Sequence, residues 1–391
     1  MATVKLGIER LIELSPSWLG EKRIGLLVNQ ASVDSQLRST LDLLVERYPH
    51  HLKVLFGPQH GIRGEKQDNM VESDDFLHPR YHIPVVSLYG KTRIPTREMM
   101  DHIDTMVIDL QDVGTRVYTF ISTMAYCLQA AKRYGKKVVV LDRPNPLGGE
   151  RVEGNILKEG LRSFVGVYPI PMRHGLTIGE VALLFNNHYQ IGCELEVIPL
   201  EGWNRRMLFH HTGLPWVAPS PNMPTSSTAL VYPGQVMLEG TNLSEGRGTT
   251  TPFELCGAPF IDPYHLKEKL HKRNLPGIHL REVFFEPTFN KWHNKVCGGV
   301  QIHVNDSHTY KPYLTTLAIL QDTLSLYPTQ FAWRTPPYEY EEEQMPIDLI
   351  TGDKRVRESI EHHLDLDQCE HSWQEDLTTF KETARRFFLY H

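Results

Sequence analysis

The chain has 391 residues, of which 40% are hydrophobic and 23% are charged. These proportions are typical of globular proteins and exclude a disordered or collagen-like chain, and the length predicts two domains. Its 41 Lys and Arg residues against 47 Asp and Glu residues give a formal charge of −6, so it lacks the basic excess that favours nucleic acid or a membrane surface as partner.

Short apolar runs that alternate with amphipathic stretches predict a parallel β-sheet in the N-terminal part. The predicted strands span residues 23–28, 53–56, 84–88, 105–110 and 137–141, each bounded by turn residues. Residues 115–134 carry apolar side chains at helical spacing and end before Gly135, which predicts a helix. Buried strands that alternate with helices indicate an α/β fold with an open, Rossmann-like parallel sheet.

The remainder of the chain is less regular. The spacing of Thr177 and Glu180 is that of a capping box and predicts a helix that runs to about Tyr189. Further strands are predicted at residues 194–198 and 300–304, and further helices near residues 263–272 and 313–327. Residues 338–344 contain four glutamates, and we expect them to form a solvated loop. We divide the chain into a Rossmann-like domain at residues 1–158 and a second α/β domain at residues 159–391.

Polar and glycine residues follow every predicted strand of the N-terminal sheet. Gln59 and His60 follow the second strand, Asp109 lies at the end of the fourth, and Arg143 follows the fifth. In an open parallel sheet, ligands bind outside the carboxyl ends of the strands. We therefore expect these groups to meet in one cleft, although surface loops are polar in any protein.

Two carboxylates close in sequence, Asp109 and Asp112, are candidates for general acid–base catalysis. Different surroundings can keep one carboxyl group protonated and the other ionised. Asp112 is equally suited to capping the helix that follows. Arg116 falls in the first turn of that predicted helix, where the helix dipole also favours an anion. Tyr118 lies off the apolar face, so it either enters the cleft or packs in the core.

No pattern indicates a metal site or a cofactor. The glycines between residues 57 and 64 lack the spacing of a dinucleotide-binding loop, and neither a P-loop nor a serine nucleophile elbow is present. Many of the 20 histidines are adjacent pairs, whose side chains diverge and do not chelate readily. The five scattered cysteines and the charged N-terminal segment lead us to expect a cytoplasmic protein, if Met1 is the natural start.

Nine sequence blocks carry a resemblance to a known family. They are FGPQHGIRG at 56–64, VSLYG at 86–90, IDLQDVGTRVY at 108–118, LDRPNPLGG at 141–149, VEG at 152–154, FVGVYPIPMRHG at 164–175, LPWVAPSPNMPT at 214–225, LEGTNLSEGRG at 238–248 and PFELCGAPFI at 252–261. The chain resembles the family known as DUF1343 or YbbC-like, whose studied members are exo-β-N-acetylmuramidases of the NamZ type. The resemblance implies a Rossmann-like catalytic domain, a smaller C-terminal α/β domain and an active site in the cleft between them. The implied reaction releases terminal N-acetylmuramic acid from the non-reducing end of peptidoglycan fragments, here in cytoplasmic recycling.

The sequence departs from the family pattern at one position. The family motif Gly-Pro-Glu-His-Gly has its proposed catalytic glutamate where this chain has Gln59, and an amide cannot act as a general acid or a carboxylate nucleophile. Another carboxylate can take its place: Glu65 is the nearest in sequence, followed by Asp109, Glu153, Glu239 and Glu245. Alternatively, the N-acetyl group of the substrate acts as nucleophile and Gln59 orients it. A third hypothesis is a muropeptide- or sugar-binding protein without hydrolysis, or a glycosidase of altered specificity.

The resemblance also suggests which residues bind the substrate. The lactyl carboxylate of muramic acid requires a cation, preferably arginine, which can donate two parallel hydrogen bonds. The arginines in the matching blocks are Arg63, Arg116, Arg143, Arg173 and Arg247. We expect His60, Tyr118, Asn145, His174, Asn222 and Asn242 to contribute the remaining polar lining. The expected partner is therefore a small sugar or muropeptide.

Overall fold

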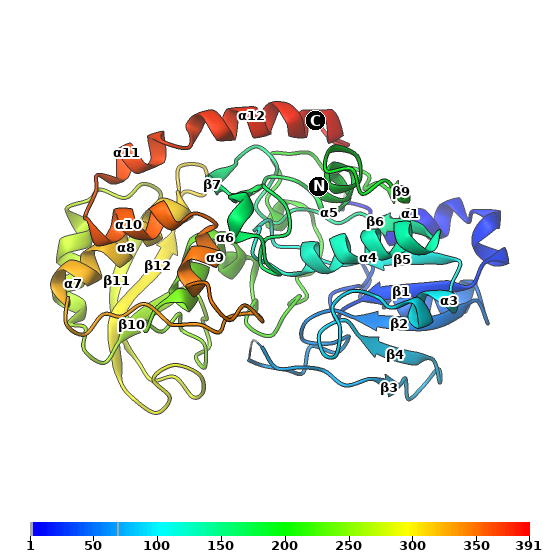
Figure 1. Ribbon diagram of the computed structural model, residues 1–391, viewed down its shortest axis with the longest axis horizontal. Helices are drawn as coiled ribbons and strands as arrows, with labels where there is room; N and C mark the ends of the chain where they lie inside the picture. Colours follow the sequence, from blue (N-terminus) through cyan, green and yellow to red (C-terminus); the bar gives the residue numbers. More distant parts are fainter. Residues whose placement is uncertain (1–2, 69) are drawn as a thin grey trace.

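The computed structural model describes residues 3–68 and 70–391. Its first half is built on a seven-stranded sheet with the strand order β3-β4-β2-β1-β5-β6-β9 (Figure 1). The strands are β1 (Ile24–Val28), β2 (Leu52–Gly57), β3 (Phe76–Leu77), β4 (Pro84–Ser87), β5 (Thr105–Asp109), β6 (Lys137–Leu141) and β9 (Glu194–Ile198). All neighbours pair in parallel except β3 and β4. The predicted α/β fold with a Rossmann-like sheet is confirmed.

Helices cover both faces of this sheet. They are α1 (Gly7–Leu14), α2 (Thr40–Arg47), α3 (Arg97–Asp101), α4 (Phe120–Tyr134) and α5 (Ile178–Leu183). The capping box at the start of α5 is present, since the Thr177 side chain accepts a hydrogen bond from the Glu180 amide. A π-helical turn (Leu184–His188) continues α5 towards Tyr189. The strands that the sequence predicts here are all present, because apolar runs of this length are stable only when both faces are covered.

The predicted helix at residues 115–134 begins later than expected, at Phe120. The chain before it is bound instead to β8 (Pro171–Arg173): Thr115 forms a β-bridge with Arg173, and the Arg116 amide donates to the carbonyl of Met172. Backbone groups that already pair with a strand cannot also form the first helical turn. Arg116 is therefore not at a helix N-terminus, and the prediction of an anion site in that turn was wrong.

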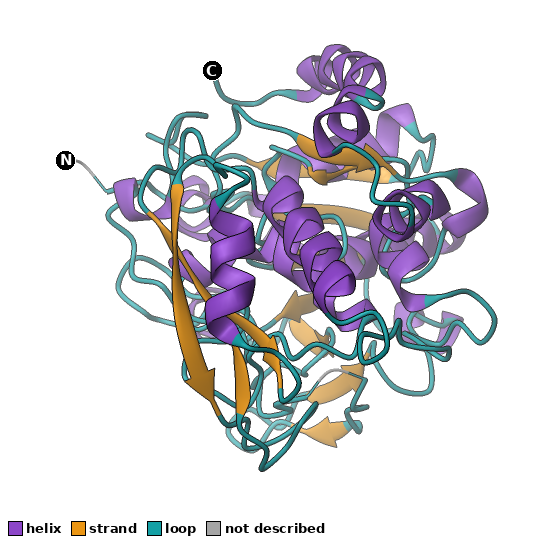
Figure 2. Cartoon of the chain, turned by 90° about the vertical axis from the view of Figure 1, so that its left-hand side faces the viewer, coloured by secondary structure: helices purple, strands orange, loops and turns teal. Residues whose placement is uncertain are grey.

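The second half contains a three-stranded antiparallel sheet in the order β10-β12-β11, seen edge-on with its helices in Figure 2. Its strands are β10 (Leu255–Ala258), β11 (Ile278–Phe285) and β12 (Cys297–Val304), and β8 pairs with β7 (Glu153–Ile156) in a separate ribbon. The helices are α6 (Ser226–Gln235), α7 (Pro263–His271), α8 (Pro312–Leu326), α9 (Pro346–Thr351), α10 (Lys354–Glu361), α11 (Leu366–His371) and α12 (Gln374–Ala384). Short 3-10 turns lie at Ser17–Glu21, Glu159–Leu161, Phe209–His211, Val236–Gly240 and Arg385–Phe387.

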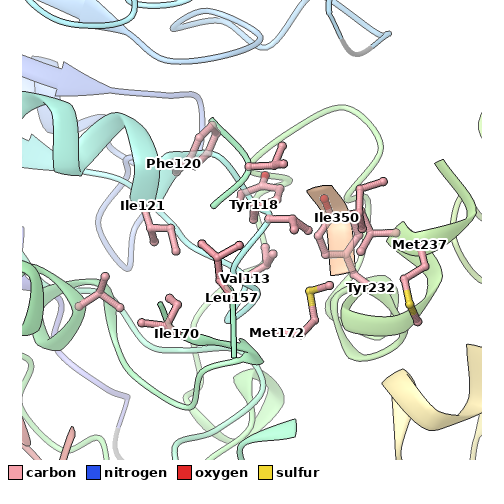
Figure 3. Packing of buried hydrophobic residues seen from close by; sticks show 14 of the residues in the cluster. Val113, Tyr118, Phe120, Ile121, Leu157, Ile170, Met172, Tyr232, Met237 and Ile350 are labelled. Atoms are coloured by element: carbon pink, nitrogen blue, oxygen red, sulfur yellow. The ribbon is translucent and has the colours of Figure 1, made fainter. Parts of the chain in front are cut away.

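The two halves share one core. Tyr118 and Ile121 from the first half pack in the same buried cluster as Tyr232, Met237 and Ile350 from the second (Figure 3). The C-terminal helices α11 and α12, red in Figure 1, run back across the molecule towards the first half. There the Tyr390 hydroxyl donates to Asp142 at the end of β6. The domain boundary after residue 158 stays a prediction. The strand β9, which follows this boundary in the sequence, belongs to the seven-stranded sheet.

Within the part of the chain that the structure describes, no helix has both the length and the apolar character needed to cross a membrane.

Candidate active site

A cavity lies where the loops after β2 and β5 face the second half of the chain. Six of the residues expected in the site line it: Gln59, His60, Tyr118, Asn222, Glu239 and Arg247. The loop after β2 turns sharply there, because the Gly61 amide bonds to the Pro58 carbonyl and Gly61 takes a φ of 75°. A left-handed φ favours glycine, so the local sequence itself presents Gln59 and His60 to the cavity.

Gln59 lies in a buried chain of side-chain hydrogen bonds. The Thr119 hydroxyl donates to Gln59 Oε1 at 2.6 Å, and Gln59 Nε2 donates to Glu339 Oε1 at 3.2 Å. The Tyr89 hydroxyl donates to the other oxygen, Oε2, of Glu339 at 2.7 Å. The carboxylate that faces Gln59 therefore comes from the opposite end of the sequence.

Glu339 corrects the expectation of a solvated loop at residues 338–344. Tyr338 and Glu339 are buried in the cavity wall, whereas Tyr340, Glu342 and Glu343 are exposed. Two reciprocal backbone hydrogen bonds between Tyr338 and Glu341 close a tight turn, with φ of 47° at Glu339 and 69° at Tyr340. Composition cannot reveal which glutamate of such a run a turn directs inward. The two tyrosines next to Glu339 were the available signal that part of this segment is buried.

The surroundings of Glu339 favour its protonated form near neutral pH. Burial raises the pKa of its carboxyl group to about 7, the negative charge of Glu239 acts in the same direction, and the hydrogen bonds from Tyr89 and Gln59 oppose the shift. A carboxyl group with such a pKa can donate a proton to a departing oxygen at neutral pH.

Glu239 has contrasting surroundings in the same cavity. Its Oε1 pairs with Nη2 of Arg247 at 2.5 Å, and its Oε2 accepts a hydrogen bond from the Tyr338 hydroxyl at 2.7 Å. Arg247 also pairs with Glu245 at 3.0 Å, and Lys291 pairs with the other oxygen of Glu245 at 2.8 Å. Although burial acts to raise the pKa of Glu245, the charges of Lys291 and Arg247 hold it below its ordinary value. Acidic and basic side chains therefore alternate in this buried cluster.

His60 enters the cavity as a neutral imidazole. Burial lowers the pKa of its ring to about 4. Its Nδ1 lies 2.8 Å from the carbonyl oxygen of Lys66 and so carries the ring proton, which leaves Nε2 as a hydrogen-bond acceptor. Asn222 is fixed beside it through a hydrogen bond from its Nδ2 to the Gln67 carbonyl at 2.6 Å. Neutral polar groups of this kind suit the hydroxyl and acetamido groups of a sugar.

Four expected site residues are not part of the cavity lining and join loops instead. Arg143 donates from Nε and Nη2 to the two oxygens of Asp109, at 2.5 and 2.9 Å. Asp112 accepts from the Gly114 amide at 2.7 Å and lies 3.1 Å from Nε2 of His174. These two buried pairs occupy the space at the ends of β5 and β6, so the strand ends do not all open into one cleft as expected.

Arg116 is also surrounded by protein atoms. It is 1% exposed, and its two Nη atoms donate to the carbonyl oxygens of Asn155, Ile170, Ile350 and Thr351 at 2.7–3.0 Å. Two of these carbonyls lie in β7 or directly before β8, and two belong to α9. Arg116 therefore connects the ribbon of β7 and β8 to α9 and does not line the cavity.

The other candidates are scattered. Glu153 accepts from the amides of Tyr313 and Leu314 at the start of α8, and burial raises its pKa to about 7. Three others donate hydrogen bonds to backbone carbonyls: Arg173 to Leu147, Asn145 to Leu176 and Asn242 to Gln330. The last two are exposed: Arg63 lies over the Phe76 ring, and Glu65 lies outside the cavity lining. Their proposed roles in the reaction remain predictions.

Within residues 3–68 and 70–391, His, Cys, Asp and Glu side chains form no group of three or more that could hold a metal ion. The polar groups that line the cavity are instead carboxylates, an arginine, hydroxyls, two amides and a neutral imidazole. Such a set can bind a polar sugar and transfer protons.

Comparisons with known proteins identify the family of this chain. Residues 24–227 match the N-terminal family model of exo-beta-N-acetylmuramidase NamZ, and residues 230–390 match the C-terminal one. The chain is 43% identical over 387 residues to the peptidoglycan beta-N-acetylmuramidase NamZ of Bacillus subtilis (strain 168), covering 99% of this chain and 91% of that protein.

Two solved structures of DUF1343 family proteins from Bacteroides fragilis NCTC 9343 share the fold. One is 34% identical with a TM-score of 0.90 and full coverage of both chains. The other is 28% identical with a TM-score of 0.78, covering 100% of this chain and 99% of that one. The residue blocks, the two matched family models and the fold together show that this chain belongs to the exo-β-N-acetylmuramidase NamZ family.

Proposed function

We propose that this protein is an exo-β-N-acetylmuramidase that hydrolyses the glycosidic bond of a terminal N-acetylmuramic acid in peptidoglycan fragments. Membership of the family supports the reaction class. The single observation that carries the proposal is the pair of carboxyl groups in the cavity: Glu339, whose pKa burial raises to about 7, and Glu239, which forms an ion pair with Arg247. Two such groups are what hydrolysis of a glycosidic bond requires.

In this proposal Glu339 is the general acid. Its proton passes to the glycosidic oxygen as the bond to the anomeric carbon breaks, and the leaving sugar departs as an alcohol. Glu239, which pairs with Arg247, faces the positive charge that develops on the sugar ring. It then either bonds to the anomeric carbon or removes a proton from the water that attacks it. Glu339 replaces the carboxylate that the family motif has at position 59, and Gln59 orients it.

The alternative, a binding protein without hydrolytic activity, rests on the amide at Gln59. The contact between Gln59 and Glu339 weakens that argument, because it places a carboxyl group with a pKa of about 7 beside the amide. Substrate assistance by the N-acetyl group stays compatible with the same cavity, since Gln59 or Tyr118 can contact that group while Glu339 protonates the leaving oxygen.

Incubation with a chromogenic N-acetylmuramide and with the disaccharide MurNAc–GlcNAc tests the proposal. We expect release of free N-acetylmuramic acid from both, and much less release by Glu339→Gln. The control Glu342→Gln changes an exposed glutamate of the same loop and leaves turnover unchanged. Saturable binding of the disaccharide without release above the buffer rate would instead establish the binding-protein alternative.

We also propose that the protein acts in the cytoplasm on recycled fragments. All five cysteines are buried and unpaired, which is usual for proteins of a reducing compartment. Fractionation of the producing cells tests this point, and recovery of the protein outside the cytoplasm would contradict it.

A further inference from the structure

A second hollow adjoins the cavity and has no role in the proposal above. It is an open groove of about 1180 Å³ between the loop before β12 and the segment before Glu339. Its lining includes two half-buried tryptophans, Trp292 and Trp333, together with Arg334, Asn242 and Met70. Aromatic faces beside polar groups are the combination with which proteins hold sugar rings.

The groove and the cavity share walls at three places. Met70 lines the groove, and its sulfur accepts a hydrogen bond from the Glu339 amide at 3.5 Å. The Arg334 guanidinium lies 5.9 Å from the ring centre of Tyr338, which lines the cavity. Thr241 of the groove wall forms a β-bridge with Trp333 and lies two positions beyond Glu239. The cavity and the groove are therefore neighbours, separated by residues that belong to the walls of both.

Among the described residues that line the groove, Arg334 is a cation that is free for a ligand. Lys291 is fully engaged, since its ammonium group contacts the Leu238 and Leu243 carbonyls and pairs with Glu245. Within residues 3–68 and 70–391, the Arg334 guanidinium forms no ion pair and donates no hydrogen bond. The backbone of Arg334 is fixed, because its amide donates a hydrogen bond to the Gly240 carbonyl at 2.9 Å. A fixed, unpaired arginine can bind a carboxylate through two parallel hydrogen bonds.

We propose that this groove is the binding site for the saccharide that continues beyond the scissile bond, with Trp333 stacking on an N-acetylated sugar ring and Arg334 binding the lactyl carboxylate of the next muramic acid unit. The inference rests on the proposed function and adds a preference for substrate length. An enzyme built in this way hydrolyses a tetrasaccharide more efficiently than a single sugar that carries a small leaving group.

The test compares two substrates in the full-length protein: the alternating tetrasaccharide MurNAc–GlcNAc–MurNAc–GlcNAc and para-nitrophenyl N-acetylmuramide. We expect Trp333→Ala and Arg334→Gln each to lower kcat/KM for the tetrasaccharide about tenfold or more, mainly through KM, and to change it less than twofold for the chromogenic sugar. Trp333→Phe and Arg334→Lys restore part of the loss. Arg97→Gln removes an equal charge from an exposed residue of α3 and leaves both values unchanged.

Equal losses on the two substrates, or no loss on the tetrasaccharide, would overturn the groove assignment. If wild-type protein releases nothing from either substrate, the proposed hydrolysis fails, and calorimetry with the intact tetrasaccharide still decides the groove. Weaker binding by Trp333→Ala and Arg334→Gln but not by Arg97→Gln supports it. Affinity that these variants do not change, or no binding by wild-type protein, refutes it.

Discussion

The amide nitrogen of Gln59 donates a hydrogen bond to a carboxylate oxygen of Glu339, a residue 280 positions away in the sequence. Thr119 fixes the other end of the amide, so Gln59 holds Glu339 in one orientation. In the proposed mechanism, the position at which the family motif has a glutamate thus holds a positioning group, and a different loop supplies the acid.

Removal of the Glu339 acid is expected to abolish most turnover. Glu339→Gln keeps the shape of the side chain but cannot donate a proton, so kcat should fall by about 10²- to 10⁴-fold. Steady-state rates with MurNAc–GlcNAc measure the loss. A decrease of less than threefold would show that Glu339 is not the general acid.

Glu65→Gln is expected to leave activity within about twofold of wild type. Glu65 is exposed and lies outside the cavity lining, although it is the carboxylate nearest to Gln59 in the sequence. The rate of hydrolysis of MurNAc–GlcNAc by Glu65→Gln is measured in the same assay. Loss of turnover in this variant, with normal thermal stability, would show that Glu65 is a catalytic residue.

The pH dependence of kcat/KM should have its alkaline limb near pH 7. Burial raises the pKa of Glu339 to about 7, and the enzyme is active while this group is protonated. The rate is therefore present below this pKa and declines as the pH rises through it. A rate profile from pH 4.5 to 9 in buffers of constant ionic strength measures the limb. A rate that increases from pH 6 to 8 would contradict the assignment.

Gln59→Glu should shift that alkaline limb to higher pH. The new carboxylate would face Glu339 at hydrogen-bond distance, and two like charges so close disfavour ionisation of the second group. The pair would then retain one proton to a higher pH than Glu339 retains it alone. Comparison of the two pH profiles tests this shift, and Gln59→Ala serves as the control without a second charge. An unchanged limb in Gln59→Glu would show that the two groups do not interact.

Arg116→Met should weaken the fold. Four buried carbonyls would lose their charged donor, which should lower the free energy of unfolding by roughly 3 kcal/mol or more. Urea denaturation measures the change, with the exposed Arg97→Met as control. Wild-type stability together with a raised KM would instead show that Arg116 binds the substrate carboxylate.

The sequence by itself determined the parallel sheet and the loop at Gln59 and His60, for local physical reasons. Apolar runs such as residues 137–141 can be stable only as buried strands, and Gly61 with Pro58 forces a turn directly after β2. The motifs at residues 56–64 and 238–248 likewise contained four residues that line the cavity, and the blocks at 108–118 and 214–225 contributed one each, Tyr118 and Asn222.

Only the tertiary structure decided which polar residues line the cavity and which connect segments of the protein. Arg116, Arg143 and Asp112 look like site residues in the sequence, but each is buried against protein partners that come from distant segments. Glu339 looks like one exposed glutamate among four, yet a turn with left-handed φ values directs it into the cavity beside Gln59. Burial and hydrogen-bond partners are set by contacts between residues far apart in the chain, and these same contacts give Glu339 a pKa of about 7.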